Sequence, residues 1–262
     1  MEDPILVTEY EGWKQITLNR PDRLNSLNEP MLQQLTGILD GIVNDTSCRA
    51  VVITGAGRAF CAGQDLEECQ PAPNKNALDL AGIMEQLYNP LVLTLRSMPK
   101  PVICAVNGVA AGGGANLALA GDIVLAGQSA KFIQAFAKIA LIPDCGGTYF
   151  LPRLIGDART RALALLAQPI DAQQAENWGM IWRAVPDAEL IKEAHALASY
   201  LATQPTGTFG LLKQALAASA TNDLATQLDL ERDLQRKASQ SADFTEGLSA
   251  FFAKRPPVFS GR

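Results

Sequence analysis

The sequence contains a single histidine, His195, among its 262 residues. A Ser-His-Asp triad would need His195 as its member, and the GxSxG motif that presents a serine nucleophile is absent. A metal site with several histidine ligands is impossible. Serine-hydrolase and multi-histidine metal chemistry are therefore disfavoured, and we expect no metal.

Cysteine is also scarce, and its spacing is uninformative for metals. The five cysteines are odd in number and form no CxxC pair, which argues against a disulfide framework or a zinc site. We expect reduced structural thiols at Cys48, Cys61, Cys69, Cys104 and Cys145.

Three further features are missing. No apolar run approaches the roughly 18–20 residues of a membrane span, and the acidic N-terminus has no secretory signal pattern. The net charge of −5 disfavours binding to nucleic acid. The strict GxGxxG pattern of dinucleotide-binding folds is absent. We expect a cytoplasmic protein with neither a membrane nor a nucleic acid as partner.

What is present is an alternation of short β-rich runs with helical stretches. Residues 5–9 and 13–18 predict a hairpin, and apolar residues spaced by three and four predict a helix over 28–43, with Asn28 as its N-cap. Continuous apolar runs predict buried strands at 50–54, 102–106 and 122–126. This order predicts an α/β fold with largely parallel strands.

Helices dominate the rest of the chain. A helix is expected over 77–97, kinked at Pro90. The sequence predicts a core over 1–200 and a helical C-terminal section over 201–262. Predicted helices at 206–218, 223–237 and 242–253 have apolar faces that must cover their own core or another subunit.

Two glycine-rich loops follow two of the buried strands. One runs from Gly55 to Leu66, and the other from Asn107 to Gly114 into a helix. Glycine permits close backbone approach, so two such loops could aim two amide groups at one oxygen, forming an oxyanion hole. The alternative is that both are ordinary tight turns.

A third segment places Asp144 after the apolar stretch 139–142 and before Gly146 and Gly147. Apolar surroundings raise the pKa of a carboxyl group and suit it to proton transfer near neutral pH. From this segment alone, an N-cap for a helix that begins near Gly146 is the stronger interpretation.

Taken together, these segments resemble the crotonase (enoyl-CoA hydratase/isomerase) superfamily in order and spacing. The matching residues are 18–21 (LNRP), 24–27 (LNSL), 60–66 (FCAGQDL), 101–108 (PVICAVNG), 112–114 (GGG) and 142–148 (IPDCGGT). The resemblance implies a spiral of β-β-α units with a helical C-terminal section, and a homotrimer or a dimer of trimers. It implies an acyl-CoA substrate and no separate cofactor, because coenzyme A is part of the substrate.

The same resemblance implies particular site residues. The oxyanion donors would be the amides of Gln64 and Gly113. The residues implied in substrate binding are Arg23, Ala62, Gly63, Gln64, Asp65, Leu66, Gly112, Gly113, Asn116, Phe136 and Lys254. Arg23, Arg58 and Lys254 could meet the phosphates of coenzyme A, or they could be solvated surface charges. We expect Asp65 to shape its loop rather than to act chemically.

The chain departs from the family's hydratases at two positions. Those enzymes use two glutamates, and the matching positions here are Asn116 and Phe136. Asp144 lies close to the acidic residue of the isomerase members. One carboxylate suffices to move a proton between two carbons, so we expect isomerisation rather than hydration.

A narrower resemblance favours one branch of the family, the isomerases of ring-1,2-epoxyphenylacetyl-CoA in bacterial phenylacetate breakdown. It is carried by residues 132–136, 140–148, 178–182 and several stretches of the C-terminal section. Phe136 would then favour an apolar aromatic pocket. The alternatives are a general Δ3,Δ2-enoyl-CoA isomerase, an enoyl-CoA hydratase, or a non-catalytic acyl-CoA-binding scaffold.

Overall fold

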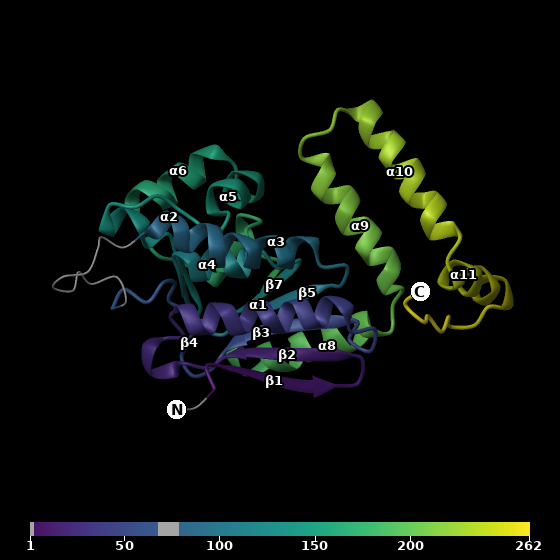
Figure 1. The fold of residues 1–262 in the computed structure, drawn as a ribbon, viewed down its shortest axis with the longest axis horizontal. Coiled ribbons are helices and arrows are strands. Elements are labelled where there is room, and N and C mark those ends of the chain that lie inside the picture. The colour runs from purple at the N-terminus through teal and green to yellow at the C-terminus, as the bar shows by residue number, and fades with distance from the viewer. Residues whose placement is uncertain (1–2, 68–78) are drawn as a thin grey trace.

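The computed structural model describes residues 3–67 and 79–262 (Figure 1). Cys69 and the first residues of the helix predicted from residue 77 lie outside this part of the chain. Two sheets carry the architecture, and helices cover them.

The first sheet contains six strands in the order β1-β2-β3-β5-β7-β10. Its members are β1 (Ile5–Tyr10), β2 (Trp13–Leu18), β3 (Ala50–Gly55), β5 (Val102–Val106), β7 (Ile123–Gly127) and β10 (Arg183–Val185). β1 and β2 form the predicted antiparallel hairpin, and every other neighbouring pair is parallel. All residues of β3 and β5 are buried, as expected for central strands covered on both faces.

A second sheet contains four short strands in the order β4-β6-β8-β9. They are β4 (Ala59–Cys61), β6 (Val109–Ala111), β8 (Lys131–Ile133) and β9 (Ile170–Asp171). The segments of β4 and β6 were expected to be parts of loops, so this expectation was wrong. Three residues are too few for a strand to show its two-residue period.

The two sheets are linked by the order of the chain. β3 leads into β4, β5 into β6 and β7 into β8, so each repeat adds one strand to each sheet before a helical or irregular stretch follows. This arrangement confirms the predicted crotonase-type spiral of β-β-α units with a helical C-terminal section.

Helices cover both faces of the six-stranded sheet and continue beyond it. In chain order they are α1 (Glu29–Asn44), α2 (Leu80–Ile83), α3 (Asn89–Ser97), α4 (Gly113–Leu119), α5 (Gly147–Ile155), α6 (Asp157–Leu166), α7 (Ala172–Asn177), α8 (Leu190–Ala202), α9 (Thr206–Ser219), α10 (Leu224–Ser239) and α11 (Ala242–Ala253). Side chains of β3 alternate between two cores: Val51 and Ile53 share one with α1, and Val52 shares the other with α8.

Local sequence explains how α1 and α3 begin. The Asn28 side chain accepts a hydrogen bond from the Met31 amide at 3.2 Å, which confirms the predicted N-cap. Before α3 the helix passes through a π-helical segment, η2 (Met84–Tyr88), directly ahead of Pro90. Proline lacks an amide hydrogen and crowds the carbonyl four residues earlier, so the wider turn relieves the clash there.

The C-terminal helices α9, α10 and α11 extend away from the sheets (Figure 1). Many of their large apolar side chains are exposed in the single chain: Leu212, Leu216, Leu224, Leu228, Phe244, Leu248, Phe251 and Phe252. Within the described residues, no helix combines the length and the apolarity that crossing a membrane requires.

Candidate active site

The three segments singled out in the sequence meet at one cavity of about 480 Å³. Its lining residues are Ala62, Gly63, Gln64, Leu66, Leu80, Tyr88, Gly112, Gly113, Ala135, Phe136, Lys138, Ile139, Leu141 and Asp144. Asp144 is the single carboxylate among these residues. Most of the other side chains are apolar, so the cavity suits an apolar group beside one ionisable acid.

The two glycine loops both line this cavity, and their backbones lie in close contact. A Cβ atom added to Gly63 would lie 2.8 Å from the carbonyl oxygen of Ala111 and 3.3 Å from the amide nitrogen of Gly113. Gly63 also has a φ of +88°, a conformation that other residues rarely adopt. Only glycine therefore allows the two backbones to approach this closely.

The amides of Gln64 and Gly113 are both available at this junction. Leu27 donates to the Gly63 carbonyl at 2.7 Å and accepts from the Asp65 amide at 2.9 Å, so its partners are the residues on either side of Gln64. The Gln64 amide donates to no backbone carbonyl of the described chain. Gly113 is the first residue of α4, where amides have no partner within the helix.

Asp144 faces the same junction. Its Oδ1 atom would lie 3.3 Å from a Cβ atom at Gly113. That oxygen is buried, and no atom within residues 3–67 and 79–262 hydrogen-bonds to it. Burial raises the pKa of Asp144, and the contact with the Cys145 thiol acts in the opposite direction without cancelling that effect.

Asp144 is not a helix cap. The helix α5 begins at Gly147, its N-cap is Gly146, and no side chain caps it. Asp144 interacts with the helix only through its backbone carbonyl, which accepts from the Gly147 amide at 2.8 Å. The N-cap interpretation that the local sequence favoured is therefore wrong, and the carboxylate is left free for the cavity.

Phe136 forms an apolar wall beside the glycine loops. The aromatic ring lies 3.6–4.0 Å from the position of a Cβ atom at Gly112, and the residue is buried. It belongs to the short helix η3 (Ala135–Ile139), which supplies four of the lining residues. A flat aromatic group bound in the cavity would have this ring available for packing.

Asn116 does not line the cavity, although the resemblance implied a contact with substrate. Its side chain is fully buried on α4. Nδ2 donates to the Asp144 carbonyl at 2.8 Å, and Oδ1 accepts from Gln134 Nε2 at 2.9 Å. Asn116 therefore contacts the backbone of Asp144 and does not reach the cavity.

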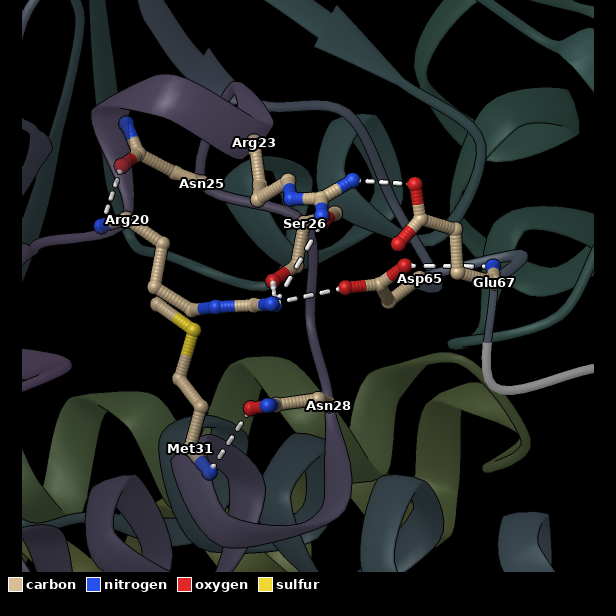
Figure 2. Close-up of polar contacts among 8 residues, drawn as sticks. All are labelled: Arg20, Arg23, Asn25, Ser26, Asn28, Met31, Asp65 and Glu67. Atoms are coloured by element: carbon tan, nitrogen blue, oxygen red, sulfur yellow. Dashed lines mark hydrogen bonds and ion pairs between the residues drawn. The ribbon is translucent and has the colours of Figure 1, made fainter.

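A polar network supports the loop that carries Gln64 (Figure 2). Arg20 donates to the Asp65 carboxylate at 2.8 Å and to the Ser26 carbonyl at 2.6 Å, and the other Asp65 oxygen accepts from the Glu67 amide at 3.2 Å. Burial opposes ionisation of Asp65, but these hydrogen bonds outweigh it and lower its pKa. Asp65 thus anchors its loop and does not line the cavity.

The basic residues implied in coenzyme A binding lie outside the cavity. Arg23 pairs with Glu67 at the surface (Figure 2). Arg58 is exposed between β3 and β4. Lys254 follows α11, at the far end of the molecule from α2 and α6 (Figure 1). Within one chain, Lys254 cannot reach the cavity.

The lining includes residues that sequence reasoning did not single out. Tyr88 comes from the π-helical segment, and Leu80 from α2. Lys138 adds a basic group to the lining of η3. The π-helical turn had one signal in the sequence, Pro90, which predicts a distortion without saying which side chains it redirects.

His195 takes no part in the cavity. Its Nε2 lies 2.6 Å from Gln15 Oε1, and its ring packs against Tyr10 and Trp13. Burial lowers its pKa. The described residues also contain no group of three or more histidine, cysteine or carboxylate side chains able to hold a metal ion.

Comparison with known proteins places this site in a family. The sequence profile of the family Enoyl-CoA hydratase/isomerase matches residues 8–262. The chain is 55% identical over 262 residues to the 1,2-epoxyphenylacetyl-CoA isomerase of Escherichia coli (strain K12), covering 100% of both proteins. It is 36% identical to the 2,3-dehydroadipyl-CoA hydratase of the same organism, covering 98% of this chain and 99% of the relative.

Solved structures agree with the sequence comparison. The crystal structure of an enoyl-CoA hydratase from Bacillus anthracis superposes with a TM-score of 0.90 at 34% identity, covering 99% of this chain and 100% of that one. The chain therefore belongs to the enoyl-CoA hydratase/isomerase family.

Proposed function

We propose that this protein isomerises acyl-CoA thioesters by moving one proton, and that its substrate is ring-1,2-epoxyphenylacetyl-CoA. The observation that carries the proposal is the position of Asp144, the one carboxylate among the cavity's described lining residues, beside the two glycine loops. The 55% identity to the Escherichia coli isomerase supports the choice of substrate.

The geometry supports a specific sequence of steps. The amides of Gln64 and Gly113 donate to the thioester oxygen, and Asp144 takes a proton from the carbon next to the carbonyl. The electron pair of that C–H bond moves into the thioester as an enolate, whose charge the two amides stabilise. Asp144 then returns the proton to a ring carbon, so the double bond becomes conjugated with the thioester.

The opening of the aromatic epoxide requires little further catalysis from the protein. The epoxide interconverts with its oxepin form by electron reorganisation, which requires no acid, base or cofactor. The protein's task is the proton shift, for which a raised pKa of Asp144 is suitable because it makes the carboxylate a stronger base. Phe136 provides an apolar surface for the ring.

Hydration is not favoured by this site. Adding water across a double bond needs one group to activate the water and another to deliver a proton. Asn116 is buried behind Asp144, and Phe136 is apolar. A general Δ3,Δ2-enoyl-CoA isomerase remains the second candidate, because the same proton shift serves an aliphatic chain and Leu66, Ile139 and Leu141 line the cavity.

Coenzyme A would enter as part of the substrate, without a separate cofactor, in a cytoplasmic enzyme. The exposed apolar side chains of α9, α10 and α11 support assembly into a homotrimer or a dimer of trimers. In such an assembly Lys254 of a neighbouring copy would meet the phosphates of coenzyme A, together with Arg23.

Product analysis tests the proposal. The protein is incubated with the aromatic epoxide thioester, with a 3-enoyl-CoA and with a 2-enoyl-CoA, and products are identified by mass and absorbance. We expect isomers of unchanged mass from the first two. Products heavier by one water would favour a hydratase, and binding of all three without turnover would favour a scaffold.

A further inference from the structure

Two buried amide side chains are hydrogen-bonded in series, and the second donates to the backbone carbonyl of Asp144. Gln134 Nε2 donates to Asn116 Oδ1 at 2.9 Å, and Asn116 Nδ2 donates to the Asp144 carbonyl at 2.8 Å. Gln134 has an exposed fraction of 3%, and Asn116 of 0%. We infer that Asn116 is a positioning residue for Asp144 and that Gln134 orients Asn116. This inference rests on the proposed function.

The direction of the hydrogen bonds follows from their last acceptor. A carbonyl oxygen can only accept, so the Asn116 atom that meets Asp144 must be the amide nitrogen. The Asn116 oxygen then faces Gln134, which must present its own nitrogen. Reversing either side-chain amide would bring two acceptors or two donors together, so each of the two amides has one possible orientation.

Gly147 makes room for this contact. A Cβ atom there would lie 2.3 Å from Asn116 Nδ2 and 2.7 Å from its Cγ, and the φ of Gly147 is not positive. Alanine would therefore fit the backbone but displace the carboxamide. The Gly147 amide also donates to the Asp144 carbonyl at 2.8 Å, so both lone pairs of that oxygen have donors.

The backbone anchor and a contact with the Cys145 thiol hold the carboxylate of Asp144 in place. Its Oδ1 atom accepts no hydrogen bond from the described residues, so side-chain contacts to that atom do not orient it. A reacting group must be held to within about 0.5 Å of its productive position, and a shift of about 1 Å can reduce a rate about 10²-fold. Loss of Asn116 should therefore lower kcat.

Substrate binding should survive that loss. The cavity walls and both glycine loops are formed by other residues, and Asn116 is not among those that line the cavity. We expect Asn116→Ala and Asn116→Leu to reduce kcat about 10²-fold with little change in KM. Leucine has the same number of side-chain heavy atoms and no donor, whereas alanine leaves a gap, so equal losses in both variants would identify the hydrogen bond rather than packing as the cause.

The experiment combines kinetics with amide hydrogen exchange on the full chain. Proton exchange at the carbon next to the thioester is measured for a 3-enoyl-CoA with Asn116→Ala, Asn116→Leu, Gly147→Ala and Gln134→Met. Asn44→Ala is the control, because Asn44 is exposed on α1 and donates only to the Asp40 carbonyl at 3.3 Å. We expect native kinetics from it.

Two double variants show whether Asn116 acts through Asp144. Adding Asn116→Ala to Asp144→Asn should cause no further loss, and adding Gly147→Ala to Asn116→Ala should cause little. Fully additive losses would overturn the inference. Normal kcat in Asn116→Leu would also overturn it.

Hydrogen exchange separates this inference from the proposed function. In the free protein, amides of residues 141–147 should exchange faster in Asn116→Leu than in the native chain and Asn44→Ala. An inactive native protein with this faster exchange would refute the proposed function but keep the anchoring role. An active native protein with unchanged exchange in Asn116→Leu would refute the anchoring role alone.

Discussion

Substituting alanine for Gly63 should separate the chemistry of this site from the stability of its fold. The added Cβ would lie 2.8 Å from the Ala111 carbonyl oxygen, where the backbone has to move. The alanine would also have to adopt the φ of +88° that Gly63 has. The loop of Gln64 would shift from that of Gly113, and the two amides would no longer converge on one oxygen.

The magnitudes follow from those two effects. Backbone strain at a positive φ costs about 1–2 kcal/mol, which for a chain of this size lowers Tm by roughly 2–8 °C. Loss of one oxyanion donor costs about 2.7–4 kcal/mol in the barrier, or about 10²–10³ in kcat. Activity should therefore fall far more than stability.

Gly156→Ala is a matched control for this experiment. Gly156 has a φ of +78°, yet a Cβ there would meet no atom of the described chain within 4 Å. It carries strain at a positive φ without the clash, so it should lose some stability and keep native kcat. Isomerisation of a 3-enoyl-CoA and calorimetric unfolding are measured for both variants. Native kcat in Gly63→Ala, with the expected fall in Tm, would refute the role of the two loops as an oxyanion hole.

Three further outcomes follow from the site. Because burial raises the pKa of Asp144, kcat/KM should fall on the acid side with a midpoint above 3.8. At Asp144 the native state then holds more protons than the unfolded state just above pH 3.8, so the contribution of this residue to the unfolding free energy should decrease as pH rises through that window. The difference in unfolding free energy between the native chain and Asp144→Asn, measured in urea titrations, should follow that decrease. Phe136→Glu should lower kcat/KM for the aromatic thioester about tenfold or more. It places a second carboxylate in the apolar wall, and by raising the pKa of Asp144 further it leaves less of that residue ionised to accept a proton; unchanged turnover would contradict this. Arg20→Ala should cost about 1.5–3 kcal/mol of stability in urea unfolding, because it removes a charged hydrogen bond from the mostly buried Asp65. Arg183→Ala breaks an exposed ion pair and should cost less than about 1 kcal/mol. A loss for Arg20→Ala below about 1 kcal/mol would show that the loop network is not stabilising.

Much of the fold could be predicted because its long elements carry strong periodic signals. The hairpin of β1 and β2 and the helix α1 follow from apolar spacing and from the cap at Asn28. The strands β4 and β6 could not be predicted, since three residues between glycines look like a loop. Their place in a second sheet comes from contacts with chain far away in sequence.

The main residues of the site could be predicted from the sequence, but the contacts between them could not. The sequence indicated Gln64, Gly113 and Asp144 as a set, but local pattern favoured a capping role for Asp144 that the structure excludes. The hydrogen bond from Asn116 to Asp144 joins residues 28 positions apart, so no local pattern reveals it. Only the folded backbone shows that Gly147 leaves space for it.

The central claim is that Asp144 alone carries the proton. The most direct test measures isomerisation of a 3-enoyl-CoA and of the aromatic epoxide thioester by the native protein and by Asp144→Asn, with acyl-CoA binding measured in parallel. The account predicts unchanged binding and a loss of both activities by about 10²-fold or more. Full activity in Asp144→Asn would contradict it.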